Sequence, residues 1–216
     1  MPLLTSLMIT KHIIMNTANQ FWDWFKRNEA QYFFINQNND PVKKEKLLDD
    51  LLLHLHRFCN KLYFEIGGHP DANHQNLIIT AEGNIDFFEQ VEALVALAPH
   101  LEYWNVTAFK PPMKGYIIKY AGLEFNPETM WFKPLYSPTV NKFSLKVYFE
   151  NYDALKNEIY RRATYLTLDN VLGEKSAVLD IGHIEIANLS TDVNREELFT
   201  FDTLESYIER IKKHRN

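Results

Sequence analysis

The chain has 216 residues, of which 46% are hydrophobic and 14% aromatic, which is enough apolar material for a substantial core. Its formal net charge of -5, from 23 basic and 28 acidic residues, argues against a nucleic-acid binder, because neutralising phosphates needs a basic surplus. The one cysteine, Cys59, excludes an intrachain disulfide and a cysteine-based zinc site, and we place the protein in the cytoplasm.

The N-terminal segment is apolar but is interrupted by Lys11 and His12. It lacks the basic start and cleavage site of a signal peptide, and it is too short to span a membrane. Thr17 and Gln20 stand at the spacing of a capping box, which predicts that the first helix begins there. We therefore expect residues 1–16 to be a loosely attached or non-native extension, with Met15 as an alternative natural start.

A second helix is predicted to begin at Asp40, an N-cap residue that is followed by proline. Leucines then recur every three or four residues as far as Leu62, which predicts one apolar stripe. A helical pair therefore precedes the first strand.

Strands and helices alternate irregularly over the rest of the chain. Strands are predicted at residues 62–68, 76–83, 103–111, 116–125, 129–136, 142–150 and 181–189. Helices are predicted at 85–99, capped by Asn84, at 152–173, the longest, which Gly173 would end, and at the C-terminus. Because strands occur both as neighbours and around helices, we expect an α+β fold with a mixed or mostly antiparallel sheet and helices packed on one face. With no repeat or linker, a single domain over residues 1–216 is expected.

Three stretches carry a resemblance to known proteins: FEIGG at 64–68, ITAEGN running into the predicted helix at 85–99, and LDNVLGE ahead of IGHIEI. In these motifs the chain resembles a family of uncharacterised bacterial proteins, over residues 20–190. The motifs are strand ends, turns and a helix end, so the resemblance implies a shared fold. It implies no catalytic residue.

The stretch FEIGGHPDANH, residues 64–74, joins two predicted strands and contains two glycines and two histidines. His69, Asp71 and His74 could bind a metal ion, but glycine, proline, aspartate and asparagine are also the residues that a hairpin turn requires. The glycines do not lead into a helix, so a phosphate-binding loop does not fit. We predict an exposed turn at residues 67–75, with no metal and no cofactor.

Strand alternation predicts sheets with one apolar and one polar face. The apolar face would hold Phe64, Leu145 and Ile184 beneath the helices. The polar face would gather Tyr63, Glu65, Lys146, Tyr148, His183 and Glu185. This set is either a solvated surface with cross-strand ion pairs or a ligand-binding or acid–base surface.

Neither a nucleophile elbow nor a zinc-protease motif is present in the sequence. The many aromatic residues could form a ligand cage, although at helical and strand spacing they more often form a core. The sequence therefore favours a binding or interaction protein, of the immunity type or a regulatory partner, with a protein as its partner. The alternative is a small hydrolase or ligand-binding enzyme that uses the polar face. We expect no membrane partner, and a monomer or homodimer.

Overall fold

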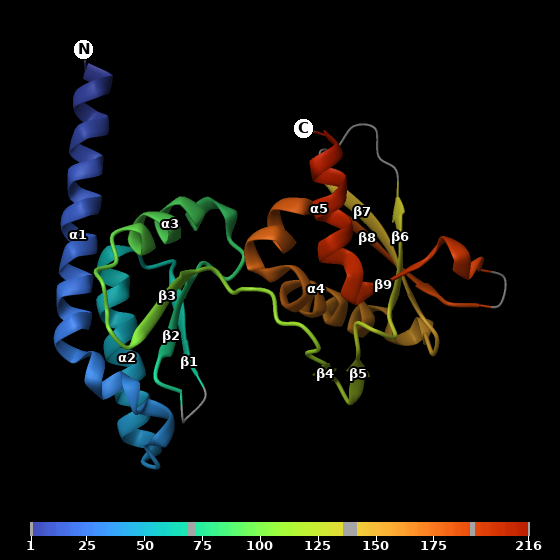
Figure 1. Cartoon of the computed structure of the whole chain (residues 1–216), viewed down its shortest axis with the longest axis horizontal. Coiled ribbons are helices and arrows are strands. Elements are labelled where there is room, and N and C mark those ends of the chain that lie inside the picture. Colours follow the sequence, from blue (N-terminus) through green and yellow to red (C-terminus); the bar gives the residue numbers. More distant parts are fainter. Residues whose placement is uncertain (1, 69–71, 136–141, 191–192, 216) are drawn as a thin grey trace. The chain divides into compact units, whose positions relative to one another are not determined.

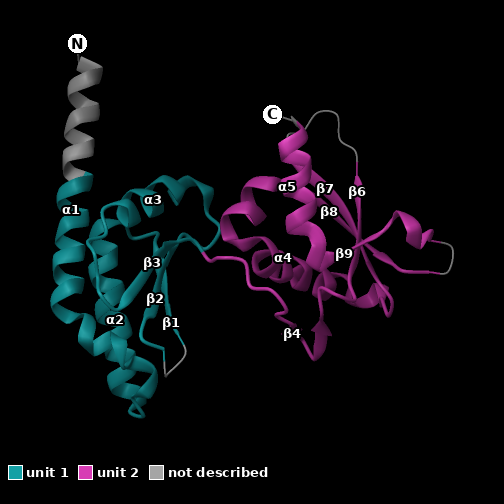
Figure 2. Ribbon diagram, in the orientation of Figure 1, with its two compact units in different colours: residues 1–109 teal, residues 110–216 magenta. Residues whose placement is uncertain are grey.

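The computed structural model describes residues 2–68, 72–135, 142–190 and 193–215, with side chains from residue 14 to residue 214 (Figure 1). The chain divides into two compact units, Met1–Phe109 and Lys110–Asn216 (Figure 2). The sequence predicted a single domain over residues 1–216. That the two units behave as one domain stays a prediction.

Helix α1 (Pro2–Phe33) is one continuous helix, so the predicted start at the capping box is wrong. Thr17 lies inside the helix, where its Oγ1 donates to the carbonyl of Ile14 at 3.1 Å. Leucine, methionine and lysine before Thr17 favour helix, and the proline stands at the first helical position, where it is tolerated. Residues 2–16 are therefore part of α1, and their loose attachment stays a prediction.

A short 3₁₀ turn, η1 (Ile35–Gln37), links α1 to helix α2 (Pro41–Phe58). The predicted cap of α2 is confirmed, since the side chain of Asp40 accepts hydrogen bonds from the backbone of Val42 and Lys43 at 3.0 and 3.2 Å. Leu51 and Leu55, from the predicted apolar stripe, are fully buried. The predicted N-terminal helical pair is confirmed.

The sheet of unit 1 contains β1 (Tyr63–Gly67), β2 (Gln75–Thr80) and β3 (Trp104–Ala108), in the order β1-β2-β3. β1 and β2 form the predicted antiparallel hairpin, whereas β2 and β3 are parallel. The crossover between them carries the 3₁₀ turn η2 (Ile85–Phe87) and helix α3 (Phe88–Ala96). Asn84 caps this segment as predicted, because its side chain accepts from the backbone of Asp86 at 3.2 Å.

One face of this sheet is covered by helices (Figure 1). Leu77 and Ile79 of β2 are fully buried on that face. The ring of Phe25 in α1 meets that of Trp104 edge-on at 5.2 Å. The indole of Trp22 donates to the carbonyl of Leu94 at 2.8 Å, which joins α1 to α3. Tyr63 and Glu65 alternate with the core residues, so they lie on the other face.

Unit 2 contains a β4–β5 hairpin, a second sheet and two main helices. Its strands are β4 (Ile118–Tyr120), β5 (Leu123–Phe125), β6 (Trp131–Leu135), β7 (Phe143–Phe149), β8 (Ile181–Asn188) and β9 (Phe199–Thr200). Its helical segments are η3 (Ala154–Lys156), α4 (Asn157–Asp180), η4 (Arg195–Glu197), η5 (Phe201–Thr203) and α5 (Leu204–Arg215). The larger sheet has the order β8-β7-β6-β9, with β7 and β8 parallel and its other described pairs antiparallel.

Helix α4 is broken at its predicted end. Gly173 interrupts the helix with φ 73° and ψ 158°, but helical backbone resumes and continues to Asp180. The residues after Gly173 include glutamate, lysine and alanine, which favour helix. With 24 residues, α4 is also shorter than α1, which has 32, so the prediction that it is the longest helix is wrong.

Helices α4 and α5 pack against the same face of the larger sheet. Phe132, Leu145 and Val147 are fully buried there against Leu168 of α4 and Leu204 of α5. The α+β class, the mixed sheets and the packing of helices on one face are therefore confirmed. Among the described residues, no helix combines the length and the apolar character that crossing a membrane requires.

Candidate functional site

The six residues of the predicted polar face do not share one sheet. Tyr63 and Glu65 lie on the open face of the unit 1 sheet. The other four lie on the larger sheet of unit 2, and they are Lys146, Tyr148, His183 and Glu185. The prediction of a single polar face is therefore corrected to two faces on separate sheets, and Glu65 and His183 are not neighbours in one sheet. The predicted alternation of side chains within each strand was right, but this alternation does not show which strands pair with each other.

The unit 2 face carries a row of charged side chains that crosses three strands. Lys146 of β7 lies 3.5 Å from Glu185 of β8, and Nε2 of His183 lies 3.8 Å from Glu185. Lys133 of β6 donates to Glu197, which η4 brings to the edge of the face. We call these five residues the charged row. Sequence analysis missed Lys133 and Glu197, although the alternation in WFKPL placed Lys133 opposite the buried Phe132.

Two lysines face each other at the centre of the charged row. Lys133 and Lys146 are direct partners across the antiparallel β6–β7 pair. A hydrogen bond to Glu197 raises the pKa of Lys133, and the same bond lowers the pKa of Glu197, so both groups are held in their charged forms. These shifts move Lys133 and Glu197 further from titration near neutral pH, so this pair is suited to binding charge.

The remaining part of this face is apolar and covered. Tyr148 is only 8% exposed, and it packs with Leu189 and Leu198 from the segment between β8 and β9. Trp131 and Ala187 pack against the same cluster. The prediction of Tyr148 as a member of an exposed polar surface is therefore wrong, because a following loop covers it. The open part of the face is the charged row.

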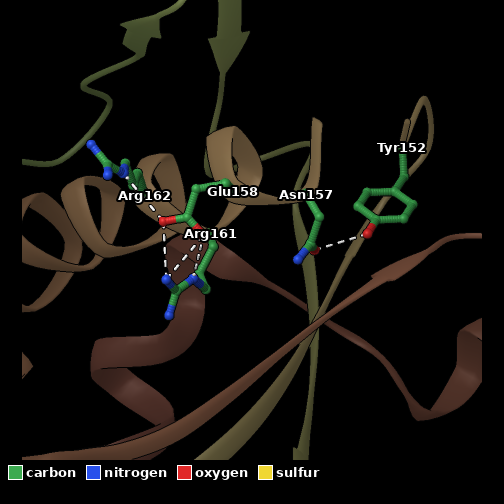
Figure 3. A network of polar contacts seen from close by, with 5 residues as sticks. All are labelled: Tyr152, Asn157, Glu158, Arg161 and Arg162. Atoms are coloured by element: carbon green, nitrogen blue, oxygen red, sulfur yellow. Dashed lines mark hydrogen bonds and ion pairs between the residues drawn. The ribbon is translucent and has the colours of Figure 1, made fainter. Parts of the chain in front are cut away.

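A second group of polar contacts lies at the start of α4 (Figure 3). Arg161 donates two hydrogen bonds to the carboxylate of Glu158, at 2.9 and 3.0 Å, and Arg162 donates a third at 3.2 Å. Tyr152 donates to Asn157 at 2.8 Å. Hydrogen bonds from Arg161 and then Arg162 lower the pKa of Glu158. All three charged side chains are exposed, so this cluster orders the first turn of the helix with small energies.

Unit 1 contains a cavity of about 490 Å³ beside the C-terminal end of α1. Its walls include four aromatic side chains, from Phe33, Phe34, Tyr103 and Trp104, and the carboxylate-bearing Glu29. The sequence named an aromatic cage as one use of these residues, but Glu29 was missed. The signal available was its position one helical turn before Phe33, which places both on one side of the helix.

The structure brings no metal site together in the part of the chain that it describes. Among those residues, no group of three or more His, Cys, Asp or Glu side chains is close enough to hold an ion. His74 is exposed at the start of β2, while His69 and Asp71 lie outside the described residues. The prediction that residues 67–75 bind no metal therefore stays a prediction, although the hairpin itself is confirmed.

Comparison with known proteins gives no match, since no family model, no curated protein and no solved structure matches the chain. The resemblance to a bacterial family in the FEIGG, ITAEGN and LDNVLGE motifs stays a prediction. The charged row and the aromatic cavity are the two candidate sites of the described residues.

Proposed function

We propose that the protein is a non-catalytic binding protein that takes an acidic protein partner on the charged row of unit 2. The observation that carries this proposal is the direct pairing of Lys133 with Lys146 across β6 and β7. Like charges directly opposite each other on one face destabilise a sheet. A carboxylate from a partner would relieve that repulsion. The lysine pair therefore lowers the stability of the free protein, and the complex recovers that stability.

The order of charges in the row indicates the kind of partner. Across the sheet it runs from Glu197 to Lys133, then Lys146 and Glu185, so two basic groups stand between two acidic ones. Apart from His183 at one end, this order is the same in both directions. A second copy docked face to face by a two-fold axis through the centre of the row would oppose like charges, which disfavours a homodimer in that arrangement. A different protein with carboxylates at the centre of its own patch fits better.

Partial exposure supports a role in recognition. The side chains of Lys133 and Lys146 are 43% and 36% exposed, so a partner can reach both without unfolding any segment. Charged pairs at a rim of this kind mainly steer association and select partners. The alternative of a small hydrolase is less well supported, because Glu65 and His183, its acid–base candidates, lie on strands of different sheets. The cytoplasm stays the proposed location.

The test is site-specific photo-crosslinking in cells from position 183, at the end of the row. We expect a crosslink to one protein through an acidic segment, identified by mass spectrometry of the joined peptides. The double variant Lys133→Glu/Lys146→Glu should abolish that crosslink, because it places four acidic groups in the row.

The control is Lys156→Glu/Lys213→Glu, which changes the net charge equally at exposed positions outside the sheet. This variant should keep the crosslink. No crosslinked protein, or equal loss with both double variants, would contradict the proposal. A crosslink between two copies of the chain would instead favour the homodimer.

A further inference from the structure

The aromatic cavity of unit 1 has the size and walls of a ligand site. Its volume of about 490 Å³ lies inside the range of about 300–1,000 Å³ that small-molecule sites occupy. Three segments of the same unit form it: the end of α1, the residues just before β2, and the start of β3. This cavity is separate in sequence and in fold from the charged row.

The aromatic side chains form one cluster whose outer members stay open to solvent. Around Phe33, the rings of Phe34, Tyr103 and Trp104 have centroids 5.1, 6.0 and 6.2 Å away and meet it at steep angles of 75°, 76° and 86°. Edge-to-face contacts of this kind hold the rings in place, and Trp104 is buried at 5% exposure. Phe34 and Tyr103 remain 55% and 49% exposed, so large apolar surfaces stay open at the cavity.

Glu29 adds a negative charge to this wall. Its Oε2 atom is shielded from solvent, and no described residue donates a hydrogen bond to it. A shielded carboxylate oxygen without a partner is costly, and a nearby cation offsets that cost. A hydrogen bond to Glu102 and the charge of that carboxylate raise the pKa of Tyr103, so its ring stays a neutral phenol near the cavity.

We propose that this cavity binds a small organic cation of the quaternary-ammonium type. Aromatic ring faces attract such a cation through their quadrupole, and the bulky, weakly hydrated ammonium head suits an apolar wall. Glu29 supplies the opposing charge. A primary ammonium or a metal ion would lose more hydration than these walls replace, since the described lining offers few oxygen ligands.

A polar groove adjoins the cavity. It shares Ala30 and Phe34 with the cavity, and it is lined further by Gln31, Gln37, Asn38 and Lys43. Amide groups and an ammonium can hold a hydroxyl or carboxylate on the remainder of the ligand. A short polar tail on a trimethylammonium head therefore fits the two hollows together.

The experiment is a calorimetric titration of the full chain with choline and with 3,3-dimethylbutan-1-ol, its uncharged analogue of the same shape. We expect choline to bind, and the alcohol to bind about tenfold more weakly or worse, since it lacks the charge. Glu29→Gln keeps the side-chain shape and should weaken choline binding by a similar factor while leaving the alcohol unchanged. Tyr103→Leu, at an exposed position, should weaken choline binding without unfolding the protein.

Matched controls separate the cavity from general charge effects. Glu45→Gln removes an exposed carboxylate of α2, and Tyr63→Leu removes an exposed tyrosine of β1, and neither residue lines the cavity. Both variants should bind choline as the unchanged protein does. The proposal is overturned if choline shows no binding at about 10 mM, if the alcohol binds equally well, or if Glu45→Gln has the effect of Glu29→Gln.

Discussion

Lys110 and Glu174 exchange two hydrogen bonds. The backbone N–H of Lys110 donates to Oε2 of Glu174 at 3.2 Å, and the backbone N–H of Glu174 donates to the carbonyl of Lys110 at 2.9 Å. Glu174 is only 2% exposed, and glutamates are rarely this buried unless they are paired. The two bonds fix the first residue of unit 2 to α4, immediately after the irregular Gly173.

Replacing this buried carboxylate is expected to destabilise the fold. Glu174→Ala should lower the free energy of unfolding by about 1–3 kcal/mol, because the N–H of Lys110 loses its acceptor in a buried setting. Urea unfolding measures the change. The control, Glu209→Ala, removes an exposed glutamate of α5 and should change stability by less than about 0.5 kcal/mol. Equal effects would show that the buried bond contributes little.

Gly173 is the less replaceable of two glycines with the same φ. Gly173 and Gly115 both have φ 73°, but the ψ of 158° at Gly173 lies in a region that essentially only glycine adopts. A Cβ on Gly173 would also lie 2.8 Å from the carbonyl oxygen of Lys110, whereas nothing lies within 4 Å at Gly115. Gly173→Ala should therefore destabilise the protein clearly more than Gly115→Ala in the same urea assay. Equal losses would mean that the backbone near Lys110 yields easily.

The titration of Glu158 tests the contacts in Figure 3. Its pKa should lie below the ordinary value of 4.5, because Arg161 and Arg162 stabilise the ionised form. A lowered pKa means that this stabilisation is present above pH 4.5 and is lost as the pH falls through the lowered value. Carboxyl-detected NMR measures the midpoint. Arg161→Ala should raise it more than Arg162→Ala does, since Arg161 makes the larger contribution.

Local chemistry in the sequence predicted much of the fold. The cap at Asp40 and the alternation that buries Leu145 and Ile184 depend on neighbours in the chain, and both are confirmed. Phe64 is only half-buried, because it lies in an edge strand of the small sheet. The predicted start of α1 was wrong, because a threonine hydroxyl can donate a hydrogen bond to a carbonyl within a helix as well as cap its start.

The candidate sites were harder to predict from the sequence than the fold was. Lys146 and Glu185 were placed on a polar face and do form an ion pair. Their grouping with Glu65 failed, because the assignment of strands to sheets depends on contacts between distant segments. The cavity at Glu29 requires α1 and β3 to meet, and these elements are about seventy residues apart in the chain.

Removing residues 1–14 is expected to leave stability unchanged within about 0.5 kcal/mol. Ala18 is the first fully buried residue among the described side chains, and Met15 is 42% exposed. In the shortened chain Thr17 would stand near the new helix start, where its hydroxyl can cap a free N–H. Thermal unfolding of both chains is the measurement. A loss of several kcal/mol would show that the removed residues pack against the core.

Leu145 and Lys146 test the two faces of one strand. Leu145 is fully buried against α4 and α5, so Leu145→Ala should cost about 2–5 kcal/mol through the cavity that it leaves. Lys146 is 36% exposed, and its contact with Glu185 at 3.5 Å is offset by repulsion from Lys133. Lys146→Ala should therefore change the free energy of unfolding by less than about 0.5 kcal/mol.

Urea unfolding of both variants measures these changes, with similar slopes expected because the native surface is the same. A large loss for Lys146→Ala would mean that its ion pair with Glu185 outweighs the repulsion from Lys133. The charged row would then be needed to hold β7 to β8, and the cross-strand lysine pair would no longer argue for an acidic partner. A neutral result leaves Lys146 free to serve recognition, because the fold does not need it.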